Sequence, residues 1–428
     1  MSIATFWRDV RWQAMGNTLA QAIGILGLPV LTRLYTPADM AAQAVFLQFA
    51  MFFAGVMTLR YEYLVQLPRA DQEAFSLVKW VVALAAVGTA VFTPLVLLVV
   101  ALWPGSEATA GGASRWAAWL WLTPATAALI SVSMAVQHLV QRLGHFKSSG
   151  MGEVAAKSGF IGFGALAALM HVGTAGILLT TGFGALAKLL VLRASNAFQW
   201  GQVLPRPSWR RTAWQPLQSV AHAHRHLSFS MVMSHLSGTV TGMAPILFIS
   251  AAYGDSQLGQ FNLVAMTIFL PASLIGTAIG QVFYQRAAKQ WADGEGFAPL
   301  WRQTASRLTL IGVPVYAAIA ILSPWAYPFL FGAQWEPAGA LAPWMALPAL
   351  CAFVSTPLER SCLVTGRWKY QMGWHGARAV TTLAVVGIAH HLQLPLPTFM
   401  ELLVVQMATL YLIDLGMEYR FAHLRPGL

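Results

Sequence analysis

The chain has 428 residues, of which 57% are hydrophobic and only 10% are charged, and its mean hydropathy is +0.59. A soluble domain carries about a quarter of its residues as Asp, Glu, Lys and Arg, because a water-facing surface needs them. The composition therefore excludes soluble enzymes, disordered scaffolds and secreted disulfide modules, and it predicts a chain that lies mostly within a lipid bilayer.

Apolar windows of about twenty residues, each long enough to cross the hydrocarbon layer as a helix, recur along the chain. We expect twelve spans, near residues 16–33, 40–59, 77–103, 116–138, 150–170, 172–192, 228–251, 259–284, 308–331, 337–358, 371–391 and 398–420. The first window lacks a small-residue cleavage site, so we interpret it as a retained helix and not a signal peptide. An even number of spans places both termini on one side of the membrane.

The distribution of Lys and Arg predicts which side that is. With a cytoplasmic N-terminus, nearly all bases fall on cytoplasmic segments or membrane edges, and the opposite loops hold only Arg33 and Arg115. Because positive charge is retained on the cytoplasmic side, we expect both termini there. This bias explains the net charge of +11 and the pI of about 10.0 without nucleic acid as a partner.

The longest cytoplasmic connection, residues 193–227, divides the predicted spans into six and six. It contains three prolines, which break helices, and tryptophans among arginines, a composition typical of a segment that lies along lipid headgroups. We therefore expect an N-lobe at residues 1–192, a basic linker at 193–227 and a C-lobe at 228–428. The predicted outer loops are short, which leaves no room for an extracytoplasmic catalytic domain.

The two halves contain related segments. The sequence MGEVAAK at residues 151–157 matches MGWHGAR at 372–378, and the loops before them, residues 144–147 and 366–369, both read glycine, base, aromatic, lysine. A weaker match links the turn at 34–41 to the turn at 252–259. This parallel repeat predicts an all-α polytopic membrane protein with two pseudo-symmetric six-helix lobes around a central cavity, a transporter architecture.

A few ionisable residues lie at membrane depth, where a charge needs a partner or a cavity. Lys157 and Arg378 occupy matched positions in the repeat. Glu153 can pair with Lys157 along one helix face, and Asp414 is level with Arg378 on the neighbouring helix. Two interpretations remain open: neutralised structural pairs, or a basic lining that attracts an anion, with the acids holding the bases or exchanging protons with them.

Polar side chains at helical spacing also occur in the first and seventh spans. Asn17 and Gln21 share one face of the first span, and Ser234 belongs to a row of four hydroxyls in the seventh. Such a row fits either a close helix contact or a cavity lining. His235 is equally consistent with a hydrogen-bonded interior residue and with a ligand.

No pattern in the chain predicts a catalytic centre, a metal site or a cofactor. Cys351 and Cys362 are ordinary thiols by their spacing, and the alternating histidines His222, His224 and His226 fit a basic interfacial strip better than a zinc site. No phosphate-binding loop is present, so we expect transport energy to come from another source than ATP bound by this chain, such as a coupling proton or sodium ion.

Three short motifs occur in a fixed order near the N-terminus: PVLTRLYTP at residues 29–37, Arg60-Tyr61-Glu62 after the second span, and Gln66-Leu67-Pro68. With the loop at 144–147, they resemble the start of a polysaccharide-repeat flippase of the Wzx type, in the multidrug/oligosaccharidyl-lipid/polysaccharide (MOP) superfamily. The resemblance covers in detail about the first 80 residues and this loop.

The resemblance implies a bacterial inner-membrane flippase that moves an undecaprenyl-diphosphate-linked oligosaccharide from the cytoplasmic to the periplasmic leaflet. Such cargo would serve O-antigen, capsule or exopolysaccharide assembly, with a polysaccharide polymerase and a chain-length regulator as partners. Buried bases suit an anionic diphosphate, and we expect Arg33, Arg60, Lys157 and Arg378 to contact the headgroup.

Two alternatives stay open at this point. A cation-coupled exporter of the multidrug and toxin extrusion kind would need carboxylates in the cavity, and the first, second, seventh and eighth predicted spans contain none. A membrane-embedded polysaccharide polymerase or ligase would need polar residues in a sizeable outer loop, whereas the longest, residues 104–115, is mostly Gly, Ala and Ser.

Overall fold

The computed structural model describes residues 3–68, 70–102, 116–204 and 218–424, and within these ranges it contains helices and turns but no β-strand. The prolines of the predicted linker and the predicted loop at 104–115 lie outside the described residues. The chain groups into two compact units, Met1–Thr239 and Val240–Leu428. The division falls inside helix α8 (Arg225–Tyr253), and each unit is described by itself.

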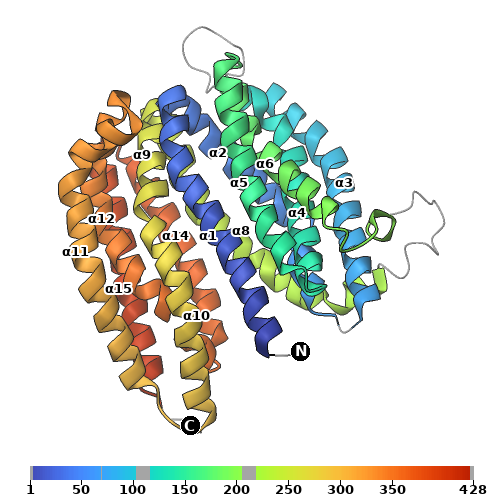
Figure 1. Ribbon diagram of the computed structural model, residues 1–428. Coiled ribbons are helices and arrows are strands. Elements are labelled where there is room, and N and C mark those ends of the chain that lie inside the picture. The colour runs from blue at the N-terminus through green and yellow to red at the C-terminus, as the bar shows by residue number, and fades with distance from the viewer. Residues whose placement is uncertain (1–2, 69, 103–115, 205–217, 425–428) are drawn as a thin grey trace. The chain divides into compact units, whose positions relative to one another are not determined.

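Unit 1 is a bundle in which α5 packs against both α1 and α6, while α4 packs against α2, α3 and α6 (Figure 1). Its elements are α1 (Ile3–Leu34), α2 (Pro37–Met57), the 3-10 turn η1 (Tyr61–Gln66), α3 (Asp71–Leu102), the 3-10 turn η2 (Ala117–Leu122), α4 (Thr123–Arg142), α5 (Phe146–Leu169), α6 (Thr174–Ala194) and the 3-10 turn η3 (Trp200–Gln202). Thr36 caps α2 through a reciprocal hydrogen-bonded box with Asp39, so the turn after α1 is defined locally.

Unit 2 is organised around α12, which packs against α9, α10, α11 and α15. Its elements are α9 (Asp255–Ile268), α10 (Leu270–Ala292), α11 (Ala298–Phe331), the 3-10 turn η4 (Ala333–Trp335), α12 (Glu336–Leu358), α13 (Ser361–Val364), α14 (Trp368–His391) and α15 (Leu396–Ala422). Helices α11 and α12 each contain three internal prolines, which helices in a membrane tolerate because neighbouring groups satisfy the freed backbone.

Among the described residues, nine helical segments are long and apolar enough to cross a membrane. They are Arg11–Leu34, Pro37–Met57, Asp71–Leu102, Ala117–Arg142, Thr174–Ala194, Arg225–Tyr253, Ala298–Phe331, Ala333–Val364 and Leu396–Ala422. Large apolar side chains on them are solvent-exposed, with Leu26 at 75% and Phe329 at 78%, as expected where lipid is the solvent. The chain is therefore an all-helical, multi-pass membrane protein.

The predicted number of twelve spans stays a prediction, although each predicted window falls on helix. The windows at 150–170 and 371–391 correspond to α5 and α14, whose N-terminal halves are polar and rich in glycine. The window at 259–284 falls on two helices, α9 and α10, which meet at Phe269 just before Pro271. These three windows are the ones absent from the set of nine.

The repeat between the two halves appears in the structure as matching helix ends. Gly144 and Gly366 both have a left-handed backbone, with φ of 79° and 72°, and the next residue donates its N–H back to the helix five residues earlier. Helices α5 and α14 then both run for 24 residues, and each ends in a second left-handed residue, His171 or Gln393. The predicted loop equivalence is thus visible in the backbone.

The matching helix ends also show that Lys157 and Arg378 are not equivalent, which corrects that prediction. Counted from the first residue of each helix, Lys157 is the twelfth residue of α5, whereas Arg378 is the eleventh of α14. One residue rotates a side chain about 100° around a helix axis, so the two bases leave their helices in different directions. The seven-residue match on which the prediction rested is shifted by one position relative to the loops before it.

Candidate functional site

The polar stripe predicted on the first span lies on an exposed face that α1 shares with α5. Asn17 and Gln21 are both exposed, and one turn further along α1 the aliphatic part of the Lys157 side chain lies beside Gly24. Lys157 is itself exposed. The structure therefore brings three predicted site residues from two helices onto one surface, where their polar groups are accessible.

Glycines allow α1 and α5 to approach closely enough to form this face. A Cβ added at Gly16 would collide with the backbone of Gly150, and one added at Gly27 would lie 2.6 Å from the Ile161 side chain. Because backbone cannot move aside as a side chain can, the Gly16–Gly150 contact fixes the separation of the two helices. Lys157 is thereby held over Gly24.

Arg33 lies in the last turn of the same helix, away from Lys157. Nine residues separate it from Gly24, a distance of about 13 Å along the helix axis. Its side chain is exposed, and its position at the C-terminal end of α1 is favourable for a positive charge. Within unit 1, Arg33 and Lys157 therefore belong to different levels of the bundle.

The predicted pairing of Glu153 with Lys157 is corrected by the structure. The carboxylate of Glu153 accepts a hydrogen bond from Lys188 of α6 at 2.9 Å and another from Gln137 of α4 at 2.7 Å. Lys188 is 7% exposed, which makes it a buried base of the bundle and not the membrane-edge charge that the sequence suggested. Glu153 and Lys188 form a structural ion pair, and Lys188 was not predicted from the sequence as the partner of Glu153.

Arg60 lies in a tight turn that is stabilised by buried hydrogen bonds. Leu59 and Arg60 are two consecutive non-glycine residues with left-handed backbone, at φ 50° and 60°. The carboxylate of Glu62, which is fully buried, lies 2.7 Å from the Thr58 hydroxyl and 3.4 Å from the Arg60 guanidinium. Burial raises the pKa of the Glu62 carboxyl above its ordinary value.

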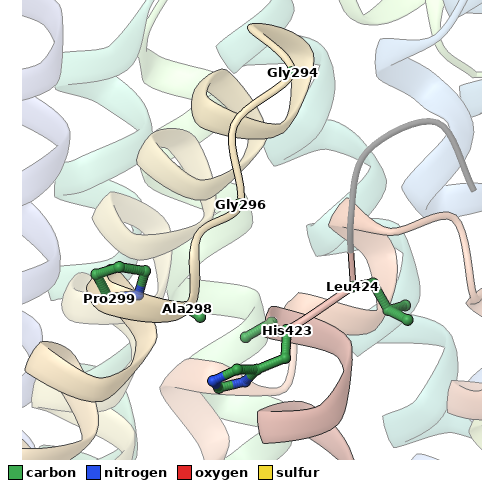
Figure 2. A pocket seen from close by; sticks show the side chains of 7 residues that line it. Gly294, Gly296, Ala298, Pro299, His423 and Leu424 are labelled. Atoms are coloured by element: carbon green, nitrogen blue, oxygen red, sulfur yellow. The ribbon is translucent and has the colours of Figure 1, made fainter.

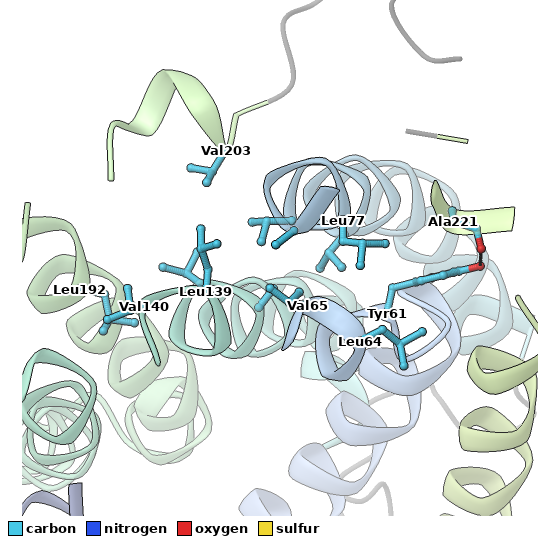
Figure 3. Packing of buried hydrophobic residues seen from close by; sticks show 14 residues of the cluster. Tyr61, Leu64, Val65, Leu77, Leu139, Val140, Leu192, Val203 and Ala221 are labelled. Carbon is cyan, nitrogen blue, oxygen red and sulfur yellow. Dashed lines mark hydrogen bonds between the residues drawn. The ribbon is translucent and has the colours of Figure 1, made fainter. Parts of the chain in front are cut away.

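The same turn is anchored in the main apolar cluster of unit 1. Tyr61 packs with Leu64, Leu77 and Leu139, and its hydroxyl donates a hydrogen bond of 2.9 Å to the carbonyl of Ala221 (Figure 3). The Arg60 guanidinium lies over the ring of the neighbouring Tyr63, with its central carbon 4.5 Å from the ring centroid. The backbone strain at Arg60 is therefore held in place by its surroundings, an arrangement common at functional sites.

The two predicted residues of the seventh span have different environments. His235 is half-buried, and its Nε2 donates a hydrogen bond of 2.9 Å to the carbonyl of Met51 in α2. The ring occupies the space left by Gly55, where a Cβ would collide with it. Ser234, the next residue along, is exposed. His235 thus has the role of an interior hydrogen-bonded residue, the simpler of its two interpretations.

In unit 2 the predicted partners Arg378 and Asp414 have different contacts. Asp414 is 1% exposed and accepts hydrogen bonds from Ser355 at 2.6 Å and from Tyr370 at 3.0 Å. The Arg378 guanidinium lies over the ring of Tyr411, with its central carbon 5.4 Å from the ring centroid, and donates to its hydroxyl at 3.4 Å. Among the described residues, no direct ion pair joins Arg378 to Asp414, although Arg378 lies near enough to interact electrostatically with the Asp414 carboxylate.

Two further acids near Asp414 were not predicted from the sequence. Glu418, one turn along α15, is fully buried, with the Ser361 hydroxyl and the Cys362 backbone beside its carboxyl group. Glu359, at the C-terminal end of α12, is partly buried. The spacing of Asp414 and Glu418, which places two acids on one helix face, could have identified Glu418 but not Glu359.

A pocket of about 370 Å³ lies at another place in unit 2, between the α10–α11 connection and the end of α15 (Figure 2). Its lining includes Gly294, Pro299 and His423. The nearby Arg302 is engaged with Tyr419 and with the Nε2 of His423, at 2.9 and 2.8 Å. The lining contains none of the predicted site residues. In the part of the chain that the structure describes, no cluster of His, Cys, Asp and Glu could hold a metal ion.

Comparison with known proteins assigns a family to this architecture. A family model described as polysaccharide biosynthesis protein matches residues 30–340. The succinoglycan biosynthesis transport protein ExoT of Rhizobium meliloti (strain 1021) is 24% identical over 399 residues, which cover 89% of this chain and 74% of that protein.

Solved structures show the same fold. An inward-facing MATE family multidrug resistance transporter of the MOP superfamily superposes with a TM-score of 0.69 at 13% identity, covering 94% of each chain. The lipid II flippase MurJ in an inward closed conformation superposes with a TM-score of 0.64 at 11% identity, covering 96% of this chain and 86% of that one. The predicted resemblance to MOP transporters is confirmed, and the polymerase or ligase alternative is not supported.

Proposed function

The chain belongs to the polysaccharide biosynthesis protein family, and on that premise we propose that it is a flippase for a lipid-linked oligosaccharide. Its cargo would be an undecaprenyl-diphosphate-linked repeat unit, turned from the cytoplasmic to the periplasmic leaflet of a bacterial inner membrane by alternating access. Both termini would lie in the cytoplasm. A polymerase and a chain-length regulator would then use the flipped repeat unit.

The observation that carries this proposal is the exposed polar face on α1 and α5. Asn17, Gln21 and Lys157 would be costly against hydrocarbon, by several kcal/mol for the charge alone. A surface with this composition inside a membrane bundle must face water or a polar ligand. An accessible ammonium group at that depth favours an anionic headgroup such as a diphosphate, while amide groups can bind sugar hydroxyls.

Arg33, Arg60 and Arg378 complete the set of bases that we propose for headgroup recognition. Arg33 is exposed, and Arg60 and Arg378 are partly buried, each with its guanidinium over a tyrosine ring. Such stacking holds a guanidinium in place while leaving donors for an anion, because the ring contacts its flat face. These three arginines would act at different stages of transport from Lys157.

The alternative of a cation-coupled drug exporter has less support. A cationic drug would need an accessible carboxylate, but Glu153 is already neutralised by Lys188, and Asp414 and Glu418 are buried. The exposed charge on the α1–α5 face is a base. This arrangement repels cations and attracts anions.

The test uses protein reconstituted in liposomes that contain an undecaprenyl-diphosphate-linked oligosaccharide. We expect the wild-type protein to expose this lipid to an enzyme on the far leaflet, and Lys157→Ala and Arg378→Ala to slow exposure at least tenfold. Lys289→Ala, at an exposed base near the end of α10, is the matched control and should flip normally. Equal rates in all three variants would remove Lys157 and Arg378 from the site, and no flipping by the wild type would refute the proposed function.

A further inference from the structure

The turn between α2 and η1 contains strained backbone at two neighbouring positions. Leu59 and Arg60 both have left-handed backbone, with φ of 50° and 60°, although neither is glycine. L-amino acids avoid this region because the side chain crowds the following carbonyl oxygen, whereas glycine enters it readily. Strain of this kind persists where the surroundings hold it and where it contributes to function. The contacts of the turn and the side chain of Arg60 therefore have to explain it.

A hydrogen bond from α8 fixes the peptide group between the two strained residues. The hydroxyl of Ser228, in the first turn of α8, donates to the carbonyl of Leu59 at 2.6 Å, and Ser228 is only 3% exposed. This carbonyl belongs to the rigid peptide plane that joins Leu59 to Arg60, so its direction depends on ψ of Leu59 and φ of Arg60. Ser228 thus contacts the backbone group whose orientation defines how Arg60 leaves the turn.

Two further hydrogen bonds hold the residues that follow Arg60. The Tyr61 hydroxyl donates to the carbonyl of Ala221, just before α8, at 2.9 Å (Figure 3). His138 of α4 donates through Nδ1 to the backbone carbonyl of Glu62 at 2.7 Å. These contacts fix the turn as a whole, whereas the contact of Ser228 acts on the strained peptide itself.

The Arg60 side chain is held in place while most of its donors stay available. Its guanidinium lies over the Tyr63 ring and contacts the Glu62 carboxylate and the Tyr63 hydroxyl, each at 3.4 Å. Strong charge-assisted hydrogen bonds are about 2.7–2.9 Å long, so both contacts are weak. The side chain is 14% exposed, and a guanidinium has five N–H donors, so an anion can still bind to it.

We propose that Ser228 is a positioning residue for headgroup recognition, which holds the Leu59–Arg60 peptide so that Arg60 presents its remaining donors to the diphosphate. This inference rests on the proposed flippase function and deepens it, because it names a residue that acts without touching the cargo. Without the Ser228 hydroxyl, the peptide can rotate out of its left-handed conformation, and the guanidinium leaves the Tyr63 ring. The base is still present in that state, but its direction is no longer fixed.

The place of Ser228 on α8 also makes the affinity of Arg60 dependent on that helix. If the first turn of α8 moves away from the end of α2, the hydrogen bond to Leu59 breaks and the strained peptide relaxes. A transporter has to bind its cargo in one conformation and release it in another, which requires a difference in affinity between the two. The hydrogen bond of Ser228 provides such a difference, because it decides whether Arg60 is held in its binding geometry.

The first experiment tests the hydrogen bond without cargo. Hydrogen exchange of the purified protein in lipid nanodiscs, measured by mass spectrometry over residues 58–63, reports how firmly the turn is held. We expect this segment to exchange about fivefold faster in Ser228→Ala than in the wild type. Ser133→Ala is the matched control, because Ser133 is also 3% exposed and donates to a carbonyl, that of Ile130 in its own helix, at 2.8 Å. Unchanged exchange in Ser228→Ala would overturn the proposal.

The second experiment asks whether Ser228 acts through Arg60. The probe is farnesyl diphosphate, a soluble prenyl diphosphate, whose Kd is measured by titration calorimetry with the protein in phosphatidylcholine nanodiscs. We expect Ser228→Ala and Arg60→Ala each to raise the Kd about five- to tenfold. The double variant should have the Kd of Arg60→Ala alone, because Ser228 has nothing left to position. Ser133→Ala should bind as the wild type does.

The failures of the two proposals can be distinguished. If Ser228→Ala raised the Kd by the same factor with and without Arg60, its effect would be general destabilisation, which overturns the positioning role. An unchanged Kd in Ser228→Ala would overturn that role as well and leave the flippase proposal standing. If the wild type bound no farnesyl diphosphate and flipped no lipid, both proposals would fail, and faster exchange in Ser228→Ala would then describe a purely structural hydrogen bond.

Discussion

The two units place buried charges at the same part of the repeat but balance them differently. In unit 1, Glu153 of α5 is neutralised by Lys188 of α6 and receives a further hydrogen bond from Gln137. In unit 2, the corresponding helices α14 and α15 bury Asp414 and Glu418, and no base is paired with either among the described residues. The acid of unit 1 is balanced by a base, whereas the acids of unit 2 contact neutral donors.

This difference separates structural charges from functional ones. A buried ion pair with hydrogen bonds to both partners has little reason to exchange protons or to bind a ligand, because its charges are already satisfied. The buried acids of α15 have neutral hydrogen-bond donors instead of a base. We therefore expect the Glu153–Lys188 pair to contribute to folding.

The largest expected effect comes from removing one partner of the Glu153–Lys188 ion pair. Lys188→Met preserves volume but leaves Glu153 without its base, and removing one partner of a buried pair destabilises by several kcal/mol. Because Glu153 is 30% exposed, we expect a smaller loss of about 2–3 kcal/mol in the free energy of unfolding, measured by thermal melting in detergent. The double variant Lys188→Met/Glu153→Gln should recover most of it.

Lys157→Met is the control for that experiment, since the sequence made Lys157 the expected partner of Glu153. We expect its melting temperature to stay close to that of the wild type, because its side chain is exposed and the ion pair of Glu153 is made by Lys188. If Lys157→Met were the more destabilised variant, the assignment of Lys188 as a structural base would be wrong. The statement that Lys188 neutralises Glu153 in unit 1 would then no longer hold.

A smaller effect tests the helix equivalence on which the comparison rests. Gly144→Ala and Gly366→Ala each force a side chain into a left-handed backbone with open space around it, so only the backbone penalty applies, about 1 kcal/mol in each case. We expect equal falls in stability. Gly373→Ala, within α14 and also in open space, should instead stabilise by roughly 0.5–1 kcal/mol. Unequal effects at Gly144 and Gly366 would contradict the shared helix ends.

Much of the fold could be predicted because hydropathy and turn signals are local properties. Over its described residues every predicted window lies mainly on helix, and the two glycine loops have the predicted correspondence. The polar stripe of Asn17 and Gln21 is exposed, and Lys157 lies beside it. The polar stripe and the glycine loops depend on spacing within one helix or on a single turn, so no knowledge of helix rotation was needed to find them. The place of Lys157, in contrast, depends on how α5 packs against α1.

The partners of the charges could not be predicted, because they depend on how helices are rotated against each other. Glu153 had one candidate base on its own helix, and only the packing of α5 on α6 selects Lys188. Arg378 was assigned the wrong register by one residue, which a seven-residue match cannot resolve. Glu418 lies near a helix end, where an acid normally reaches water, so its burial becomes visible only in three dimensions.

The smallest expected effect concerns Glu62, a buried acid of unit 1. Burial raises the pKa of Glu62, so the folded protein binds this proton more tightly than the unfolded chain does. The free energy of unfolding must then fall as pH rises from about 4.5, the ordinary value, through the raised pKa. Glu62→Gln cannot titrate and should show a flatter dependence of melting temperature on pH. If melting temperature depended on pH in the same way in the wild type and in Glu62→Gln, Thr58 and Arg60 would compensate the buried charge of Glu62 fully. Glu62 would then be neutralised by its partners, as Glu153 is.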